Sequence, residues 1–420
     1  MIPGYDEGRN LKARLAFLLV VVLLVGGCRG AKLADYETVP HAQSVHPIEL
    51  ATVVDSAGIH LLWASADQGV NYQRRDADSE TWSRPKHLSS EPGSELHILN
   101  SASALHLFWI DTKLQYLRSL DNGNNWQPAG ERIPLTGFRV RYLAALAGNS
   151  ALHLLVTTDD HRMLYLRSND EGKHWTRLFE LASSEVYRRT PGALTLDQQG
   201  TLYAVWAEVD LVRGGFSQGS LFYRKGPSEG EMWGETVEIF SQENIQIAKL
   251  VVVATADKLL VVWNGGGGSL PVDLYWQTSH DEGAHWNAPS TVTRGWPGGG
   301  EQFQPCGSES LCLLWIDKRH AERDWWYKIP IVGDVVWGLN TGLDPVWENN
   351  DLYLVRNLEG DQWTGEQRLT EKLSYVHAFD TAWGKETLYV LWSGKQKINK
   401  KVDTTPSSYQ VYLGLHTLSK

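Results

Sequence analysis

Residues 105–126, LHLFWIDTKLQYLRSLDNGNNW, join two sequence patterns that recur along the chain. The first pattern is a short apolar strand that ends in Trp, here residues 105–109. The second is an aromatic strand that runs into a turn of the form SxDxGxxW, here ending at Trp126. Because aromatic residues favour strands and Gly supplies turns with positive φ, the two patterns together predict consecutive antiparallel hairpins.

The Trp-ended strand occurs seven times, although one copy has lost its Trp. Its last positions are Trp63, Trp109, Val156, Trp206, Trp263, Trp315 and Trp392. The steps between them are 46, 47, 50, 57, 52 and 77 residues, which is the size of a four-stranded propeller blade with its loops. The spacing predicts an all-β chain folded as a β-propeller of seven four-stranded blades. Six blades with one displaced repeat is the alternative.

The second pattern is complete in three copies, namely Ser119, Asp121, Gly123 and Trp126; Ser168, Asp170, Gly172 and Trp175; and Ser279, Asp281, Gly283 and Trp286. Degenerate copies end at Trp82, Trp233 and Trp363. In such a turn the carboxylate accepts backbone N–H groups, the Gly takes positive φ and the Trp folds back over the sheet. A carboxylate held by its own turn is not free for acid–base chemistry, so these residues are predicted to be structural.

With these repeats the chain resembles the Asp-box (BNR repeat) β-propellers, a superfamily that includes sialidases and several non-enzymatic propellers. The resemblance covers roughly residues 45 to 416. It implies that the Asp boxes lie on the turns between the third and fourth strands, on the face away from an active site. It also implies that a sialidase would need three Arg, a Tyr nucleophile activated by a Glu, and an Asp acid. The sequence assigns none of these firmly.

The repeat pattern predicts only three strands for the last blade before the sequence ends. Residues 36–42, just before the first blade, have the composition to supply the missing outer strand. An unpaired sheet edge exposes backbone donors and acceptors, which favours such a closure. We therefore expect N- and C-terminal strands to share one blade.

The N-terminus resembles a bacterial lipoprotein signal. Lys12 and Arg14 precede an apolar run of 11 residues, 15–25, which is followed by Gly26, Gly27 and Cys28. The run is too short to span a bilayer as a helix, for which ~20 residues are needed, and small residues before Cys are what a lipoprotein signal peptidase requires. We predict a signal peptide at 1–27, lipidation of Cys28 and a tether at 28–44. Arg29 favours the outer membrane if the source is Gram-negative.

Residues 45–420 are expected to form the propeller. With 42% hydrophobic and 21% charged residues, this is a folded chain, and its net charge of −10 argues against a nucleic-acid partner. Cys306 and Cys312 flank a short turn and are either a disulfide or two buried thiols. They have no nearby His or Cys to complete a zinc tetrahedron, so we expect no metal and no cofactor.

A ligand site is expected at the channel mouth, where loops between blades and between second and third strands meet. An insertion at 317–350 adds charged and aromatic residues suited to a sugar, of which we single out Asp317, Arg319, Trp325 and Trp326. Arg188, Arg189 and Arg294 enter blades at the same face and are suited to bind a carboxylate.

Two functions follow from this sequence. The first is a lipid-anchored propeller of the cell envelope that binds a glycan or a protein partner at its mouth. The second is an exo-α-sialidase or related glycoside hydrolase, with Tyr187 and Glu208, or Tyr375 and Glu301, as candidate pairs by loop position. Whether the chain is monomeric or oligomeric is not indicated.

Overall fold

The computed structural model describes residues 36–417 with internal gaps. The gaps are 129–132, 149–150, 177–178, 184–186, 190–191, 213–214, 228–229, 231, 244, 268–269, 293–301, 308–310, 318–349, 359–360, 371–372, 385–386 and 397–408. Side chains are also left undescribed at 187–189, 210–212, 215–217, 246, 267, 270–272, 358, 373–375, 396 and 417. All elements in the described part are β-strands.

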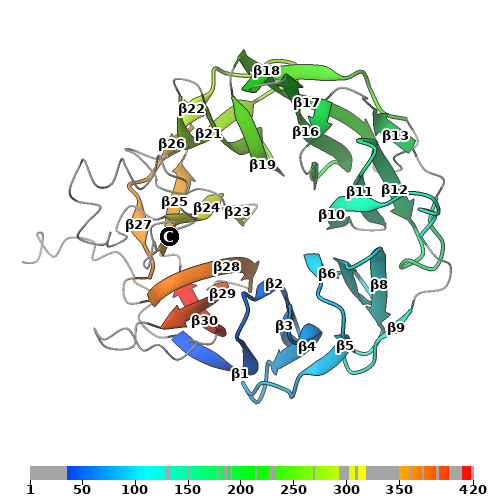
Figure 1. Cartoon of the computed structure of the whole chain (residues 1–420), viewed down its shortest axis with the longest axis vertical. Coiled ribbons are helices and arrows are strands. Elements are labelled where there is room, and N and C mark those ends of the chain that lie inside the picture. The colour runs from blue at the N-terminus through cyan, green and yellow to red at the C-terminus, as the bar shows by residue number, and fades with distance from the viewer. Residues whose placement is uncertain are drawn as a thin grey trace, which may run out of the picture.

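The strands form seven antiparallel sheets arranged as blades around a central axis (Figure 1). Blade 1 comprises β2 (Glu49–Asp55), β3 (Gly58–Ser65), β4 (Gly69–Asp76) and β5 (Lys86–Ser89). Blade 2 comprises β6 (Ser94–Asn100), β7 (Leu105–Ile110), β8 (Leu114–Ser119) and β9 (Gln127–Pro128). Blade 3 comprises β10 (Val140–Ala147), β11 (Leu152–Thr158), β12 (Met163–Ser168) and β13 (Phe179–Ala182). In each blade the first strand is innermost and the fourth is outermost.

The remaining blades follow the same plan with two interruptions. Blade 4 comprises β14 (Tyr187–Arg189), β15 (Ala193–Leu196), β16 (Thr201–Val212), β17 (Gly215–Pro227) and β18 (Val237–Glu243), and blade 5 comprises β19 (Gln246–Ala254), β20 (Leu259–Gly267), β21 (Leu270–Ser279) and β22 (Ser290–Thr291). Blade 6 comprises β23 (Phe303–Cys306), β24 (Cys312–Asp317), β25 (Asp351–Leu358), β26 (Gln362–Trp363) and β27 (Gln367–Arg368). Blade 7 comprises β28 (Leu373–Trp383), β29 (Thr387–Gln396), β30 (Tyr409–Thr417) and β1 (Tyr36–Ser44). In blade 4 the inner strand is split into β14 and β15, and in blade 6 the outer strand is split into β26 and β27.

The ring is closed by β1, which pairs antiparallel with β30 and is the outer strand of blade 7. The predicted closure is therefore confirmed, and the six-bladed alternative is wrong because the seventh sheet is complete. One boundary needs correction. The propeller begins at Tyr36 rather than at residue 45, so the expected tether at 28–44 extends too far: residues 36–44 form β1, where pairing with β30 satisfies backbone groups that a tether would leave to water.

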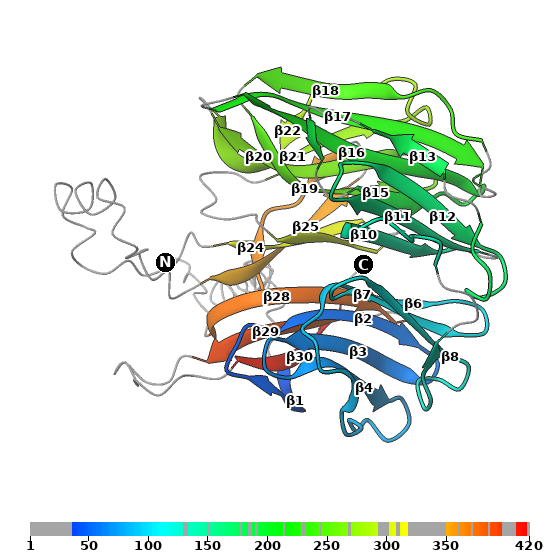
Figure 2. The same ribbon diagram turned by 45° about the vertical axis from the view of Figure 1, so that its right-hand side comes forward.

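The Trp-ended strands are the second strands of the blades and form the core. Trp63, Trp206, Trp263, Trp315 and Trp392 are among the largest fully buried side chains. They reach across to neighbouring blades, as where Trp63 packs with Leu391 and Val411 of blade 7. In Figure 2 the blades lie face against face, so that both faces of most strands are covered. This explains why the strands are apolar throughout rather than alternating.

The SxDxGxxW turns pack each blade against the blade that precedes it. In blade 3 the Asp170 carboxylate accepts the N–H of His174 at 2.9 Å, and the Ser168 hydroxyl accepts the N–H of Gly172 at 2.9 Å. Gly172 lies against Tyr116 of blade 2, and Trp175 packs edge-on against the same ring at 5.8 Å. The same arrangement joins four further blade pairs, through Trp126 with Tyr72, Trp233 with Tyr165, Trp286 with Tyr223 and Trp363 with Trp276.

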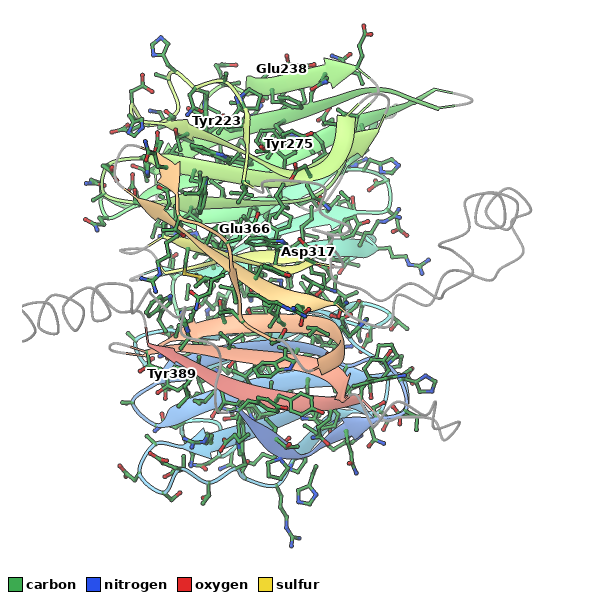
Figure 3. The ribbon with its side chains drawn as sticks, turned by 90° about the vertical axis from the view of Figure 1, so that its left-hand side faces the viewer. Tyr223, Glu238, Tyr275, Asp317, Glu366 and Tyr389 are labelled. Carbon is green, nitrogen blue, oxygen red and sulfur yellow. A yellow bond between two sulfur atoms is a disulfide. The ribbon has the colours of Figure 1, made fainter. Side chains whose placement is uncertain are left out.

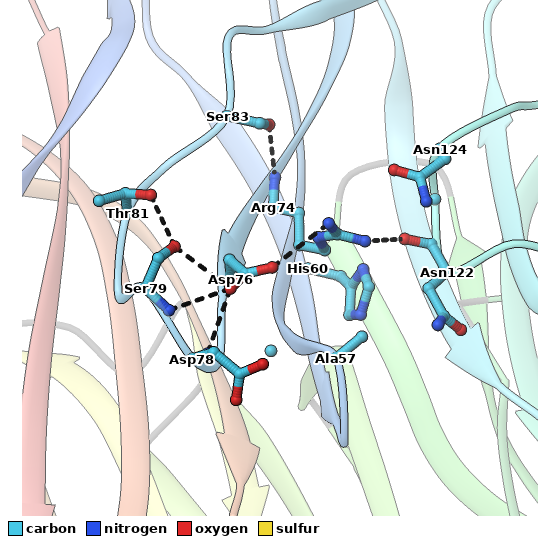
Figure 4. A network of polar contacts seen from close by, with 12 residues as sticks. Ala57, His60, Arg74, Asp76, Asp78, Ser79, Thr81, Ser83, Asn122 and Asn124 are labelled. Carbon is cyan, nitrogen blue, oxygen red and sulfur yellow. Dashed lines mark hydrogen bonds and ion pairs between the residues drawn. The ribbon is translucent and has the colours of Figure 1, made fainter.

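The degenerate turn of blade 1 keeps the same function with different residues (Figure 4). Asp76 accepts the N–H groups of Asp78 and Ser79 at 3.2 and 3.1 Å. Arg74 then donates to the carbonyl of Asn122, in the complete turn of blade 2, at 2.7 Å. Side chains in such turns are therefore used to hold one blade on the next.

The antiparallel order of the strands gives the propeller two distinct faces. One face carries the turns between third and fourth strands and the hairpins between first and second strands, and we call it the turn face. The other carries the connections between blades and between second and third strands, and we call it the mouth face. At the turn face of blade 6, Cys306 and Cys312 lie opposite each other in β23 and β24, 4.9 Å apart between Cα atoms, and form a disulfide.

Candidate functional site

Most of the site residues expected from the sequence lie outside the described residues. This applies to Arg294, Arg319, Trp325 and Trp326 and to the lipidation site Cys28. For Arg188 and Arg189 the structure describes the backbone only, which forms β14, the part of the blade 4 inner strand nearest the mouth face. Both positions thus belong to the channel wall.

Asp317 is described, and it is part of the sheet rather than of an exposed loop. It is the last residue of β24, is only 1% exposed and accepts the indole N–H of Trp315 at 3.1 Å. It lies directly opposite Asp351 of β25, whose carboxylate contacts Arg368 and Thr370. In Figure 3, which labels Asp317, blade 6 is seen toward the viewer. The insertion therefore leaves and re-enters the sheet at two adjacent buried carboxylates.

The channel wall is made of the free edges of the inner strands. Each inner strand pairs with only one neighbour within its own blade, so its other edge presents unpaired backbone groups to the channel. Several of these groups are satisfied by a side chain from the preceding blade. His97 and Glu95 of blade 2 contact the carbonyl and N–H of Leu143 in blade 3, at 3.0 and 3.3 Å.

The same kind of contact continues around the ring. Gln304 of blade 6 donates to the carbonyl of Phe379 in blade 7 at 3.5 Å, and Asp380 of blade 7 accepts the N–H of Thr52 in blade 1 at 2.6 Å. Polar side chains from blades far apart in sequence are thereby brought to the inner strands around the axis of the ring. They serve as structural links between blades and also supply hydrogen-bonding groups to the channel wall.

Irregular backbone accompanies these residues at the mouth half of the inner strands. The β6 register shifts between Ser94 and His97, and Glu95, inside this bulge, has a φ of 50°. The β19 register shifts just before Lys249, whose N–H is satisfied by the Asn264 side chain at 2.7 Å. Bulges redirect side chains and are frequent beside functional sites, and positive φ in a non-Gly residue is uncommon.

Lys249 reaches the neighbouring blade through a ring rather than through a hydrogen bond: its ammonium lies over Phe303 of blade 6, 5.6 Å from the ring centroid. Among the described residues this ammonium has no hydrogen-bond or ion-pair partner. The side chain is half-buried, as expected for a residue on a channel wall. The carboxylates of Glu95, Asp380 and Glu49, from three other blades, act on its charge without contacting it.

These surroundings shift the pKa values of four of these side chains, Glu95, His97, Lys249 and Asp380. Burial lowers the pKa of Lys249, while the three carboxylates oppose this effect. Burial raises the pKa of Glu95, raises the pKa of Asp380 to about 6 and lowers the pKa of His97 to about 4. A cluster of shifted pKa values in a concave site is a recognised indicator of function. We take Glu49, Glu95, His97, Lys249, Gln304 and Asp380, here called the channel cluster, as the candidate site.

The chemistry of the channel cluster suits a ligand rich in hydroxyl groups. The ammonium and the Gln304 amide donate hydrogen bonds, and the three carboxylates accept them. Within the described residues, no group of three or more His, Cys, Asp or Glu side chains is placed to hold a metal ion. In the same part of the chain no helix is long and apolar enough to cross a membrane.

Comparison with known proteins gives the fold. No family model and no curated protein matches the sequence. Among solved structures, an ulvan lyase aligns with a TM-score of 0.57 at 10% identity, over 92% of this chain and 95% of its own. A lectin from Burkholderia pseudomallei aligns with a TM-score of 0.58 at 10% identity, over 89% and 96%. The chain shares their propeller fold.

A sialidase from Trypanosoma rangeli is also similar, with a TM-score of 0.49 and 13% identity, over 84% of this chain and 58% of its own. That likeness is too low to bear on activity. The site must be argued from its own residues.

Proposed function

We propose that the protein is a lipid-anchored propeller of the cell envelope that binds a glycan in its channel. The observation that carries this proposal is Lys249, a half-buried cation on which carboxylates from three other blades act, with the Phe303 ring beneath it and no hydrogen-bond or ion-pair partner among the described residues. A ligand with several hydroxyl groups would accept hydrogen bonds from this ammonium and donate them to the neighbouring carboxylates of Glu95 and Asp380. A protein partner at the same mouth is the less specific alternative.

Two further observations support a carbohydrate. Two of the structures that share the fold are, by name, a polysaccharide lyase and a lectin. The insertion at 317–350 is rich in Trp, Arg and acidic residues, and it starts and ends at the mouth face, beside Asp317 and Asp351. Aromatic rings that stack on sugars are a common component of such sites.

A screen of the detergent-solubilised full chain against an array of bacterial and host glycans tests the proposal. We expect binding to a limited set of glycans, and loss of that binding in Lys249→Met. The matched control is Lys113→Met, because Lys113 is exposed on the mouth face and lies outside the channel cluster. Absence of any glycan binding by the unmodified protein would contradict the proposal.

The second candidate is a glycoside hydrolase, and one observation favours it. Burial raises the pKa of Glu95 and raises the pKa of Asp380 to about 6, and a carboxyl group with a raised pKa can act as a general acid. For the sialidase type in particular, the side chains of Tyr187, Arg188, Arg189 and Tyr375 lie outside the described residues. Incubation with fluorogenic sialosides and other aryl glycosides distinguishes binding from hydrolysis.

A further inference from the structure

We infer that the turn face of the propeller lies against the membrane and that the mouth face points away from it. The inference rests on the proposed lipid anchor at Cys28 and adds an orientation to it. It follows from where the chain enters the propeller. In β1 the register pairs Ser44 with Tyr409, and Tyr36 with Gly414.

This register fixes the face at which β1 begins. β30 is the third strand of blade 7 and runs from the mouth face, at Tyr409, to the turn face, at Thr417. β1 is antiparallel to it, so that Ser44 lies at the mouth face and Tyr36 toward the turn face. A lipid attached upstream of Tyr36 is therefore connected to the turn-face side of the ring.

The connection is short. Cys28 precedes Tyr36 by eight positions in the sequence. Even a fully extended chain of this length reaches at most ~28 Å. A strand of this size extends ~25 Å from the turn face to the mouth face. If the mouth face lay against the bilayer, the segment from Cys28 to Tyr36 would need almost its full extended length to run along the side of the propeller to the membrane. The turn face can approach the lipid surface directly.

The distribution of exposed apolar side chains agrees with this orientation. Among the described residues, the large hydrophobic side chains that are exposed are Tyr36, Val45, Leu120, Met232, Val237 and Leu415. Only Val45 lies at the mouth face, in the connection between β1 and β2. Leu120 and Met232, 56% and 75% exposed, are in turns between third and fourth strands, which is where a lipid surface would meet them.

The consequence concerns the ligand. If the mouth points away from the bilayer, the channel cluster is open to glycan chains that extend through the aqueous compartment. Headgroups of the lipids in which the protein is anchored would be out of its reach.

Energy transfer in reconstituted vesicles tests the orientation. The lipidated full chain is placed in phosphatidylethanolamine–phosphatidylglycerol vesicles that carry a rhodamine-labelled lipid, with a donor dye on one introduced cysteine. Asp78→Cys puts the dye on the turn face and Thr112→Cys puts it on the mouth face, and both positions are exposed. We expect clearly greater transfer from the dye at 78 than from the dye at 112.

Equal transfer from the two positions, or greater transfer from 112, would overturn the orientation while leaving the anchor intact. Failure of the anchor gives a different result, because the unlabelled protein would then not float with the vesicles. Flotation that persists in Cys28→Ala would likewise contradict an anchor at Cys28. The glycan screen described above is independent of both outcomes.

Discussion

The Asp380 carboxylate in the last blade accepts the backbone N–H of Thr52 in the first blade at 2.6 Å. The two residues are separated by 328 positions in the chain, and their contact lies on the channel wall, next to the closure of the ring. The same carboxylate is within the electrostatic influence of Lys249 in blade 5. One aspartate thus links the closure of the propeller to its candidate binding site.

The first prediction concerns the pH dependence of stability. Burial raises the pKa of Asp380 to about 6, above its ordinary value of 3.8. A carboxyl group with a raised pKa binds its proton more tightly in the folded state, so its contribution is present at low pH and is lost as pH rises from about 3.8 to about 6. We expect the free energy of unfolding to fall over this window relative to Asp380→Asn, by at most ~3 kcal/mol.

Denaturant unfolding of both proteins at several pH values measures this difference. The exposed Asp78→Asn variant is the control and should follow the unmodified protein at every pH. Parallel pH profiles for the unmodified protein and Asp380→Asn would show that Asp380 is not buried as described.

A second prediction concerns the contact between blades at Gly172. A Cβ atom at this position would lie 1.7 Å from the hydroxyl oxygen of Tyr116, and the backbone φ is 75°. We expect Gly172→Ala to lower stability by ~2–4 kcal/mol, through backbone strain and overpacking together.

Gly137 provides a control that separates the two causes. Its φ is 87°, but a Cβ there would meet nothing within 4 Å. Gly137→Ala should therefore cost only the backbone strain, ~1 kcal/mol. Equal losses of melting temperature in the two variants would mean that the packing of Tyr116 under Gly172 contributes little.

A third prediction separates the turn aspartates from the ligand site. Asp121 accepts the N–H of Asn125 at 2.7 Å, and this bond holds the pKa of Asp121 below its ordinary value. Asp121→Ala should lower stability by ~1–2 kcal/mol and leave glycan affinity unchanged in the folded protein. The same holds for Asp170, and Asp281→Ala should likewise leave glycan affinity unchanged. A variant that unfolds normally but no longer binds glycan would assign these residues to the site instead.

The fourth prediction concerns the insertion at 317–350. Its two ends are adjacent, because Asp317 and Asp351 are paired across β24 and β25. Replacing 318–349 with a two-residue hairpin turn should leave the propeller folded. If Arg319 contacts an anionic group of the ligand, Arg319→Ala should weaken binding by ~1.5–3 kcal/mol. Unchanged affinity after the deletion, measured by calorimetry, would place the site deeper in the channel.

The propeller architecture could be predicted from the sequence because each blade repeats the same short sequence patterns. The six Trp-ended strands, the seventh copy that ends at Val156 and the SxDxGxxW turns predicted the number of blades, the strand order and the outer strand supplied from residue 36 onward. Each of these features depends on residues close together in the sequence, such as the Gly that fits under a neighbouring Tyr. Because the same short pattern recurs at a regular spacing, it can be recognised from the sequence.

The channel cluster was not predicted, since no motif contains it. Glu95, Lys249 and Asp380 are brought together only when the ring closes. One signal was present in the sequence, namely single charged residues in otherwise apolar inner strands, such as Lys249 in IAKLVVVA and Asp380 in VHAFDTAW. Bulges in β6 and β19 change the direction of the side chains beside them, and the hydrophobic pattern of the sequence does not reveal where these bulges occur.

The central claim is that Lys249 contacts the ligand. The most direct measurement is the affinity of the protein and of Lys249→Met for the glycan identified in the screen, determined by calorimetry with Lys113→Met as control. The account predicts that Lys249→Met weakens binding by at least ~10-fold, corresponding to ~1.4 kcal/mol, while folding normally and while Lys113→Met binds like the unmodified protein. Equal affinities for all three proteins would contradict the account.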